Sequence, residues 1–311
     1  MKSLVIFNPA AGPREARDAL KKAINVLKQG NWRVEVVETT ESEEAIGLSR
    51  EAASLNYGAV VAAGGDGTVS EVANGLVGSR TALGVLPLGT GNVWARQIGF
   101  TRAHLFLGVP DVLKAAELLL ESRIHPVDVG IANRRYFLLW SGIGIDAKVT
   151  EEVEARPGVK RRLGPAAFVA AAIVTAITFA GTKATFYLDT IKLRQRVILA
   201  IVSNIRLYGA LVQVAPYARL DDGLLDVCIF KGYRFPQLLH HVYAVFSGHH
   251  VRDPSIEMKQ VTSLMVYTAK PMPIHADGEP IGTTPVRFGI RRRALKALIP
   301  PTCPSDLFSK R

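Results

Sequence analysis

Short apolar runs alternate with amphipathic stretches over the first 120 residues of the chain. Runs such as SLVIFN (3–8) and GAVVAAG (58–64) are continuously apolar, which is typical of strands buried on both faces of a parallel sheet. Between the strands, residues 15–30 and 42–55 carry apolar side chains at helical spacing and predict helices. The strands predicted in this way cover residues 3–8, 32–39, 58–64 and 82–89. This alternation predicts a parallel sheet wrapped by helices, with ligands at the carboxyl ends of the strands.

The pattern changes after a further predicted helix at 111–123. From about residue 124 the chain is rich in short strand-like segments, and no internal repeat is visible. Helices are still expected at about 144–154, 163–180 and 234–246. We therefore expect two domains. These are an α/β domain at 1–123, joined by about 292–311 on the return of the chain, and a β-rich domain at 124–291.

Composition narrows the choice of partners. The 311 residues are 48% hydrophobic, which indicates a globular protein, and Lys and Arg outnumber Asp and Glu by 38 to 27. The net charge of +11 favours anionic partners such as nucleotide phosphates or an acidic membrane, although solubility alone could also explain it. No nucleic-acid partner is expected, because aromatic and basic residues do not interleave in a recognised binding motif. The two cysteines, Cys228 and Cys303, have no metal-type spacing and suggest a reducing compartment.

Two segments bear on membrane association. The apolar run before Asn8 is too short for a signal peptide and fits a first strand. The stretch at 165–181 is at the short end for a membrane span, so we expect a buried or lipid-facing helix. The basic cluster RPGVKRR (156–162) precedes it directly, and we hypothesise that cluster and helix dock on lipid.

Three glycine-containing loops follow three of the predicted strands. They are NPAAG (8–12), GGDGT (64–68) and PLGTGN (87–92). Glycines at the end of a strand and before a helix let phosphate oxygens approach the backbone N–H groups. Asp66 would repel bare phosphate, but it fits if Mg²⁺ bridges the two; the alternative is a simple Asp-Gly turn. The spacing matches neither the Walker A motif nor the dinucleotide fingerprint.

In this order and at these intervals, the three loops resemble the diacylglycerol kinase catalytic domain family, which includes sphingosine and ceramide kinases. The resemblance continues through SGIGIDAKV (141–149), APYARLDDGLLDV (215–227) and HADGEP (275–280), and so spans nearly the whole chain. It implies a three-layer α/β nucleotide domain of NAD kinase and phosphofructokinase type, followed by a β-rich sandwich domain. GGDGT alone is shared with NAD kinases, whereas the full set is specific to lipid kinases.

The resemblance also implies roles for individual residues. The positions expected to contact ATP are Asn8, Thr40, Gly64, Gly65, Asp66, Gly67, Thr68, Val69, Ser70, Thr90, Gly91 and Asn92. Glu279 would be the general base toward the lipid hydroxyl, with Asp277 assisting and Asp66 serving the Mg²⁺-phosphate end. The expected ligands of a second, structural Mg²⁺ are Asp222 and the main-chain oxygens of Arg219 and Leu224. The chain departs from the family at Ser70, where Asn is frequent, and at Val93, where Asp is frequent.

These features predict an ATP- and Mg²⁺-dependent lipid kinase, with diacylglycerol as the expected substrate and phosphatidic acid as its product. We expect ATP in the cleft between the domains, a cytoplasmic enzyme bound peripherally to the membrane, and a homodimer as one option. One alternative is an NAD kinase-like enzyme, and another is a regulator without turnover. Asp66, Asp277 and Glu279 argue against the regulator, although DGE could also be a hairpin turn with solvated acids.

Overall fold

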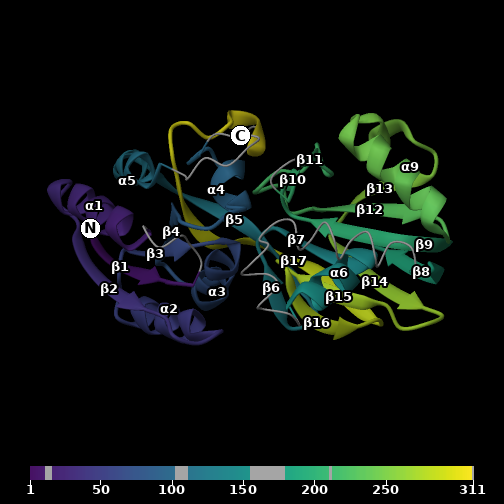
Figure 1. Cartoon of the computed structure of the whole chain (residues 1–311), viewed down its shortest axis with the longest axis horizontal. Helices are drawn as coiled ribbons and strands as arrows, with labels where there is room; N and C mark the ends of the chain where they lie inside the picture. Colours follow the sequence, from purple (N-terminus) through teal and green to yellow (C-terminus); the bar gives the residue numbers. More distant parts are fainter. Residues whose placement is uncertain (11–15, 102–110, 155–178, 210–211, 310–311) are drawn as a thin grey trace.

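The computed structural model describes residues 1–10, 16–101, 111–154, 179–209 and 212–309 (Figure 1). The N-terminal part contains β1 (Lys2–Phe7), α1 (Ala16–Gln29), β2 (Arg33–Glu38), α2 (Glu44–Ser54), β3 (Ala59–Gly64), α3 (Asp66–Leu76), β4 (Ala82–Pro87), α4 (Val93–Gln97) and α5 (Val112–Glu121). The rest contains β5 (Arg123–Ala132), β6 (Arg135–Phe137), β7 (Trp140–Gly144), α6 (Ile145–Glu154), β8 (Thr182–Leu188), β9 (Ile191–Ser203), β10 (Leu207–Tyr208), β11 (Val212–Gln213), β12 (Leu225–Lys231), α9 (Phe235–Phe246), η1 (His249–Arg252), β13 (Ile256–Val261), β14 (Ser263–Thr268), β15 (Pro273–Ala276), β16 (Glu279–Thr283), β17 (Val286–Ile299) and η2 (Ser305–Leu307). The basic cluster 156–162 and nearly all of the predicted helix 163–180 lie outside the described residues.

The N-terminal part is a three-layer α/β arrangement, as the sequence predicts. Its parallel strands lie in the order β2-β1-β3-β4, and β3 and β4 are buried along their whole length. Helices α1 and α5 pack together on one side of the strands, and α2 and α3 pack together on the other (Figure 1). Burial on both faces explains the uninterrupted apolar runs of these strands.

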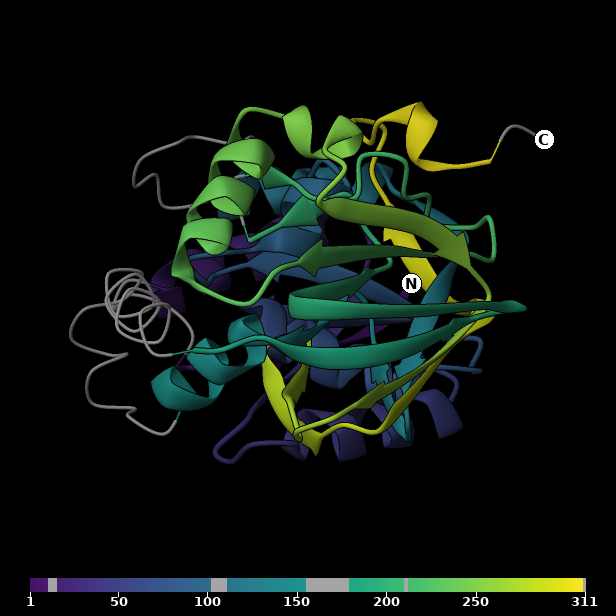
Figure 2. The same ribbon diagram turned by 90° about the vertical axis from the view of Figure 1, so that its right-hand side faces the viewer.

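The C-terminal part is β-rich and largely antiparallel. Its central strand is β9, whose 13 residues pair with β7, β8 and β12. Helix α9 covers β12 through a cluster that includes Phe230 and Ala244, and α6 lies beside β7 and β15 (Figure 2). In the part of the chain that the structure describes, no helix is long and apolar enough to cross a membrane.

Two long strands join the halves into one mixed sheet of fifteen strands. The C-terminal end of β17 runs parallel to β4, with Lys296 opposite Ala82, whereas its N-terminal end pairs antiparallel with β14. Strand β5 lies antiparallel to β17 along both regions. The sheet therefore continues from one half into the other.

Candidate active site between the two halves

The loops after β3 and β4 touch through their glycines. A Cβ atom built on Gly89 would lie 2.6 Å from the Cα atom of Gly65, a distance that no side chain tolerates. Asn92 holds the second loop in shape, because its side-chain amide bonds both the N–H and the C=O of Gly89. Gly65 and Gly89 therefore bring the GGDGT and PLGTGN loops into direct contact, at the edge where the sequence predicts a phosphate site.

Asp66 links the GGDGT loop to the PLGTGN loop by a hydrogen bond. It is the first residue of α3, and its Oδ1 accepts the N–H of Trp94 at 3.1 Å, at the start of α4. Burial raises the pKa of its carboxyl, while backbone N–H groups of Asn92, Val93 and Trp94 and the charge of Arg96 act in the opposite direction. A divalent cation on this carboxylate would offset the cost of its burial.

The space above these loops contains an unpaired hydroxyl. Thr68 is only 4% exposed, and among the described residues its Oγ1 has no hydrogen-bond partner. A Cβ on Gly64 would lie 2.4 Å from this oxygen, so glycine is required there. A buried hydroxyl without a partner is costly unless a ligand satisfies it, and a phosphate oxygen would do so. The loop therefore fits ATP phosphates.

The other residues predicted to contact ATP lie in the loops that follow β1, β2 and β4. Asn8 directly follows β1; its N–H bonds the carbonyl of Ala63 at 3.1 Å, and its side-chain oxygen accepts the N–H of Ala10. Thr40 follows β2, and its N–H and hydroxyl both bond the carboxylate of Glu44. The site-facing ends of β1, β3 and β4 are thus adjacent, whereas Thr40 is exposed one strand further out, and Thr90 is also exposed.

Across from the loops, Asp277 occupies the tight hairpin between β15 and β16. It has φ +50°, and Gly278 follows with φ +87°, a pair typical of a two-residue hairpin turn. Its carboxylate accepts the N–H groups of Leu138 at 2.7 Å, Leu139 at 2.8 Å and Trp140 at 3.2 Å. Burial raises its pKa to about 6 despite these donors and the hydroxyl of Ser70. Asp277 therefore links the hairpin to α3 and to the start of β7.

Glu279 begins β16 and is less enclosed. Its Oε2 forms an ion pair with Arg135 of β6, whose other terminal nitrogen bonds Glu43 at 2.8 Å. Burial raises the pKa of Glu279 to about 6; Arg135 lowers it, and Glu71 and Asp277 raise it further. A carboxyl with such a pKa is well matched to proton abstraction near neutral pH.

Ser70 and Asn74 of α3 reach across to the second half. Ser70 bonds Asp277, and the Asn74 side chain bonds both the C=O of Tyr136 at 3.1 Å and its N–H at 3.2 Å. The helix that starts in the GGDGT loop thus contacts the segment that carries the two acids. At the position where the family frequently has Asn, the smaller Ser70 of this chain still provides a hydrogen bond.

A polar network behind the hairpin was not predicted from the sequence. His275 is 1% exposed, and its Nδ1 accepts the N–H of Gly278 at 3.1 Å, which leaves Nε2–H to bond Asp146 Oδ2 at 2.6 Å. The hydroxyl of Tyr208 bonds the other oxygen of Asp146. Both Asp146 and His275 fall in motifs that carry the family resemblance, which was the only signal in the sequence that could have revealed them.

The predicted structural Mg²⁺ site is formed by other residues than those of the candidate active site. Asp222 Oδ1 accepts the N–H of Leu224 at 3.0 Å, and its pKa is raised by burial and by Asp128 and Asp221. The guanidinium of Arg292 lies against this turn and bonds the main-chain oxygen of Asp222. Among the described residues, no three acidic, His or Cys side chains are placed to hold a metal ion. The Mg²⁺ at Arg219, Asp222 and Leu224 stays a prediction that relies on main-chain oxygens.

Comparisons with known proteins agree with this arrangement. The diacylglycerol kinase catalytic domain model matches residues 2–132, and the YegS C-terminal NAD kinase beta sandwich-like domain model matches residues 141–299. The chain is 27% identical to "Diacylglycerol kinase" of Bacillus subtilis (strain 168), across 96% of both proteins. It is 29% identical to "Probable lipid kinase YegS-like" of Klebsiella pneumoniae (strain 342), across 97% of both.

Solved structures share the fold over almost the full length. A crystal structure from Bacillus anthracis str. Sterne, assigned to the diacylglycerol kinases, has a TM-score of 0.80 at 25% identity and covers 97% of this chain and 96% of its own. A second one from the same organism has a TM-score of 0.74 at 23% identity and covers 97% and 98%. The family resemblance and the fold class predicted from the sequence are both confirmed.

Proposed function

Since this chain belongs to the family of kinases that combine a diacylglycerol kinase catalytic domain with a YegS C-terminal domain, we propose that it transfers the γ-phosphoryl group of ATP to the hydroxyl of diacylglycerol. The product would be phosphatidic acid. The relatives that are named diacylglycerol kinase or lipid kinase support this substrate class. The enzyme would work in the cytoplasm at the surface of the membrane that holds its substrate.

The observation that carries the proposal is the contact between α3 and the hairpin. Helix α3 begins in the GGDGT loop and bonds Asp277 through Ser70, two residues before Glu279. This contact supports a site in which the phosphates of ATP, bound at the start of α3, lie near the hairpin that carries Glu279. Phosphoryl transfer requires this combination of a positioned donor and an oriented acceptor hydroxyl more than it requires covalent chemistry.

The residues divide the chemistry among them. Free backbone N–H groups of the GGDGT turn at the start of α3 and the Thr68 hydroxyl would bind phosphate oxygens, and Asp66 would hold Mg²⁺. When bound, Mg²⁺ neutralises charge on the phosphates. Glu279 would take the proton of the lipid hydroxyl as a general base. Asp277 would act as a positioning residue, because its three bonds to backbone N–H groups hold the turn that precedes Glu279.

The ion pair with Arg135 has a role in this scheme. It holds the Glu279 carboxylate at the edge of the site and lowers its pKa, whereas burial and the neighbouring Glu71 raise it. The opposing effects leave a base that is ionised at neutral pH and still basic enough to accept a proton. Arg135 lies in β6, which α3 also contacts through Asn74. Strand β6 therefore supports both Glu279 and the helix that begins in the GGDGT loop.

A phosphate-transfer assay on a panel of acceptors tests the function. Labelled Mg²⁺-ATP is mixed with vesicles that each contain one lipid, namely diacylglycerol, phosphatidylglycerol, a sphingoid base or monoacylglycerol, and with soluble NAD in a separate tube. We expect label in phosphatidic acid and none in the NAD tube. Label in another lipid alone would mean that this lipid, and not diacylglycerol, is the substrate. Label in NAD alone would contradict the proposal that the protein is a lipid kinase.

A further inference from the structure

Helix α9 exposes an apolar stripe on the side that faces away from the sheet. Leu239, Val242, Tyr243 and Phe246 are 53%, 47%, 68% and 66% exposed, and their spacing places them on one face of the helix. The opposite face is the one that packs, through the buried His241 and Ala244. A helix at the surface of a water-soluble domain has one apolar face, whereas α9 has a second one without a partner among the described residues.

The surroundings of the stripe are basic. Residues 231–252 contain no Asp or Glu, but they include Lys231, Arg234, Arg252 and four histidines. The guanidinium groups of Arg234 and Arg196 both lie over the ring of the exposed Tyr233. Bilayer interfaces favour this combination of apolar side chains, tyrosines and cations, because the cations meet the headgroups and the apolar side chains reach the acyl boundary.

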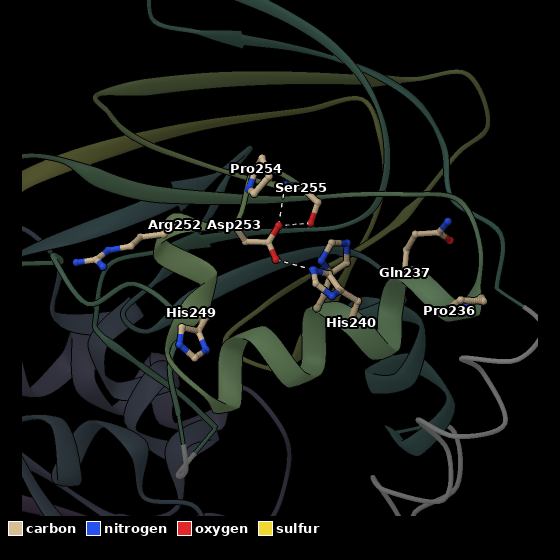
Figure 3. A pocket seen from close by; sticks show the side chains of 9 residues that line it. Pro236, Gln237, His240, His249, Arg252, Asp253, Pro254 and Ser255 are labelled. Atoms are coloured by element: carbon tan, nitrogen blue, oxygen red, sulfur yellow. Dashed lines mark hydrogen bonds and ion pairs between the residues drawn. The ribbon is translucent and has the colours of Figure 1, made fainter.

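A hollow lies beside α9 (Figure 3). It has a volume of about 710 Å³ and lies between α9 and η1. Its lining consists of Pro236, Gln237, His240, His241, His249, Arg252, Asp253, Pro254 and Ser255. Its one acid, Asp253, is already bonded to His240 and Ser255, and burial lowers the pKa of His241, so the charge that remains on the lining is that of Arg252. The hollow therefore adds one cation, Arg252, to the border of the stripe.

We propose that the α9 stripe, together with its basic border, is the surface by which this protein docks on an anionic lipid bilayer. The proposal rests on the proposed function to the extent that a lipid substrate has to be reached in a membrane. The occupant is a lipid surface, because the apolar residues are bordered by cations and no acid lies between residues 231 and 252. A partner of neutral charge would gain nothing from that border.

Helix α9, which carries the docking surface, shares an apolar cluster with α6, which supports the catalytic hairpin. Phe235 and Leu238 in the first turn of α9 belong to one apolar cluster with Ile145 and Val149 of α6. Figure 2 shows α6 and α9 on the same side of the C-terminal half. Asp146, also on α6, bonds His275, which in turn bonds the turn that carries Asp277. Membrane contact at α9 would thus fix the orientation of the element that supports the active site.

Vesicle sedimentation without ATP tests the docking surface. The full-length protein is mixed with phosphatidylcholine vesicles that do or do not contain phosphatidylglycerol. We expect Leu239→Ser combined with Phe246→Ser to weaken binding to the anionic vesicles about tenfold or more, since both side chains would leave the acyl boundary. Arg234→Glu should weaken it by at least about fivefold and reduce its dependence on salt.

Matched substitutions control for stability. Leu55→Ser and Ile191→Ser remove side chains that are 57% and 53% exposed, but lie elsewhere, and they should leave vesicle binding unchanged. In the kinase assay, the α9 double variant should lose activity toward diacylglycerol in bilayers and keep it toward a water-dispersed short-chain diacylglycerol. A double variant that binds vesicles as the wild type does would overturn the proposal.

Two other outcomes are distinguishable in these experiments: dimer formation through the stripe, and absence of the proposed lipid kinase activity. If the stripe joins two copies, light scattering would detect a dimer that the double variant lacks, and vesicle binding would not change; this result would also overturn the proposal. Vesicle binding that depends on α9, in a protein that phosphorylates no lipid, would support the docking surface and contradict the proposed function. Lipid phosphorylation by a protein whose vesicle binding does not depend on α9 would support the proposed function and contradict the docking surface.

Discussion

At the scale of single residues, the two acids of the hairpin lie two positions apart but have different environments. Asp277 is 8% exposed and is bonded by three backbone N–H groups, so it stabilises the turn. Glu279 has one ion pair, to Arg135, and remains accessible to an acceptor hydroxyl. Sequence spacing alone could not separate these roles, because the backbone N–H partners of Asp277 and the Arg135 partner of Glu279 lie about 140 positions earlier in the chain.

The raised pKa of Glu279 gives a pH dependence. Burial raises the pKa of this carboxyl to about 6, so its protonated and ionised forms are equal near pH 6 and the protonated form dominates below it. Only the deprotonated form acts as a base, so kcat/KM should fall about tenfold per unit below that pH and level off above it. The measurement is a pH–rate profile on dispersed short-chain substrate. A flat profile between pH 5 and 7 would contradict the role of Glu279.

Substitution of Asp277 should reduce stability more than substitution of Glu279. In Asp277→Asn an amide N–H₂ would face backbone donors in a buried site, so we expect a loss of about 1–3 kcal/mol in the free energy of unfolding. Glu279→Gln keeps a side chain of similar shape in a more open position, and it should cost less than about 1 kcal/mol. Urea unfolding at neutral pH measures both. Equal losses would mean that Asp277 has no special structural role.

At the scale of elements, α3 connects the nucleotide loop to the rest of the molecule. It begins at Asp66, packs against α2, and contacts the second half through Ser70 and Asn74. It lies close to α2 at Gly75, where a Cβ would be 2.5 Å from the carbonyl oxygen of Ile46. The sequence predicts a helix after GGDGT. It does not indicate that α2 is the helix that packs closely against it.

A pair of glycine substitutions tests this packing. Gly75→Ala should destabilise the protein by about 1–3 kcal/mol, because the added methyl group has to displace the backbone of α2. Gly47→Ala is the matched control on α2 itself, where nothing lies within 4 Å, and it should stabilise by about 0.5–1 kcal/mol. Thermal unfolding of the two variants should show shifts of opposite sign. Shifts of the same sign would refute the packing argument.

At the scale of the whole molecule, β17 and β5 make the two halves one sheet. The parallel strands of the first half were predictable, because burial on both faces leaves continuous apolar runs such as Ala59–Gly64. The pairing of Lys296 with Ala82 was not, since strand pairing over more than 200 residues leaves no periodic signal. The network of Asp146, His275 and Tyr208 escaped prediction for the same reason.

A continuous sheet predicts cooperative unfolding. Breaking β17 in one half removes hydrogen bonds in the other, so calorimetry should show a single transition. Tryptophan fluorescence reports on both halves, because Trp94 lies in the first and Trp140 in the second, and it should coincide with circular dichroism. Two separate transitions would show that the halves are energetically independent.

The central claim is that Glu279 acts as the base beside a loop that binds ATP independently of it. The most direct test compares wild type and Glu279→Gln at neutral pH for phosphate transfer from Mg²⁺-ATP to diacylglycerol vesicles, with ATP affinity measured in parallel. The account predicts a rate loss of about 10²–10⁴-fold with ATP affinity preserved within about twofold. A variant that keeps the wild-type rate, or that loses ATP binding along with turnover, would contradict it.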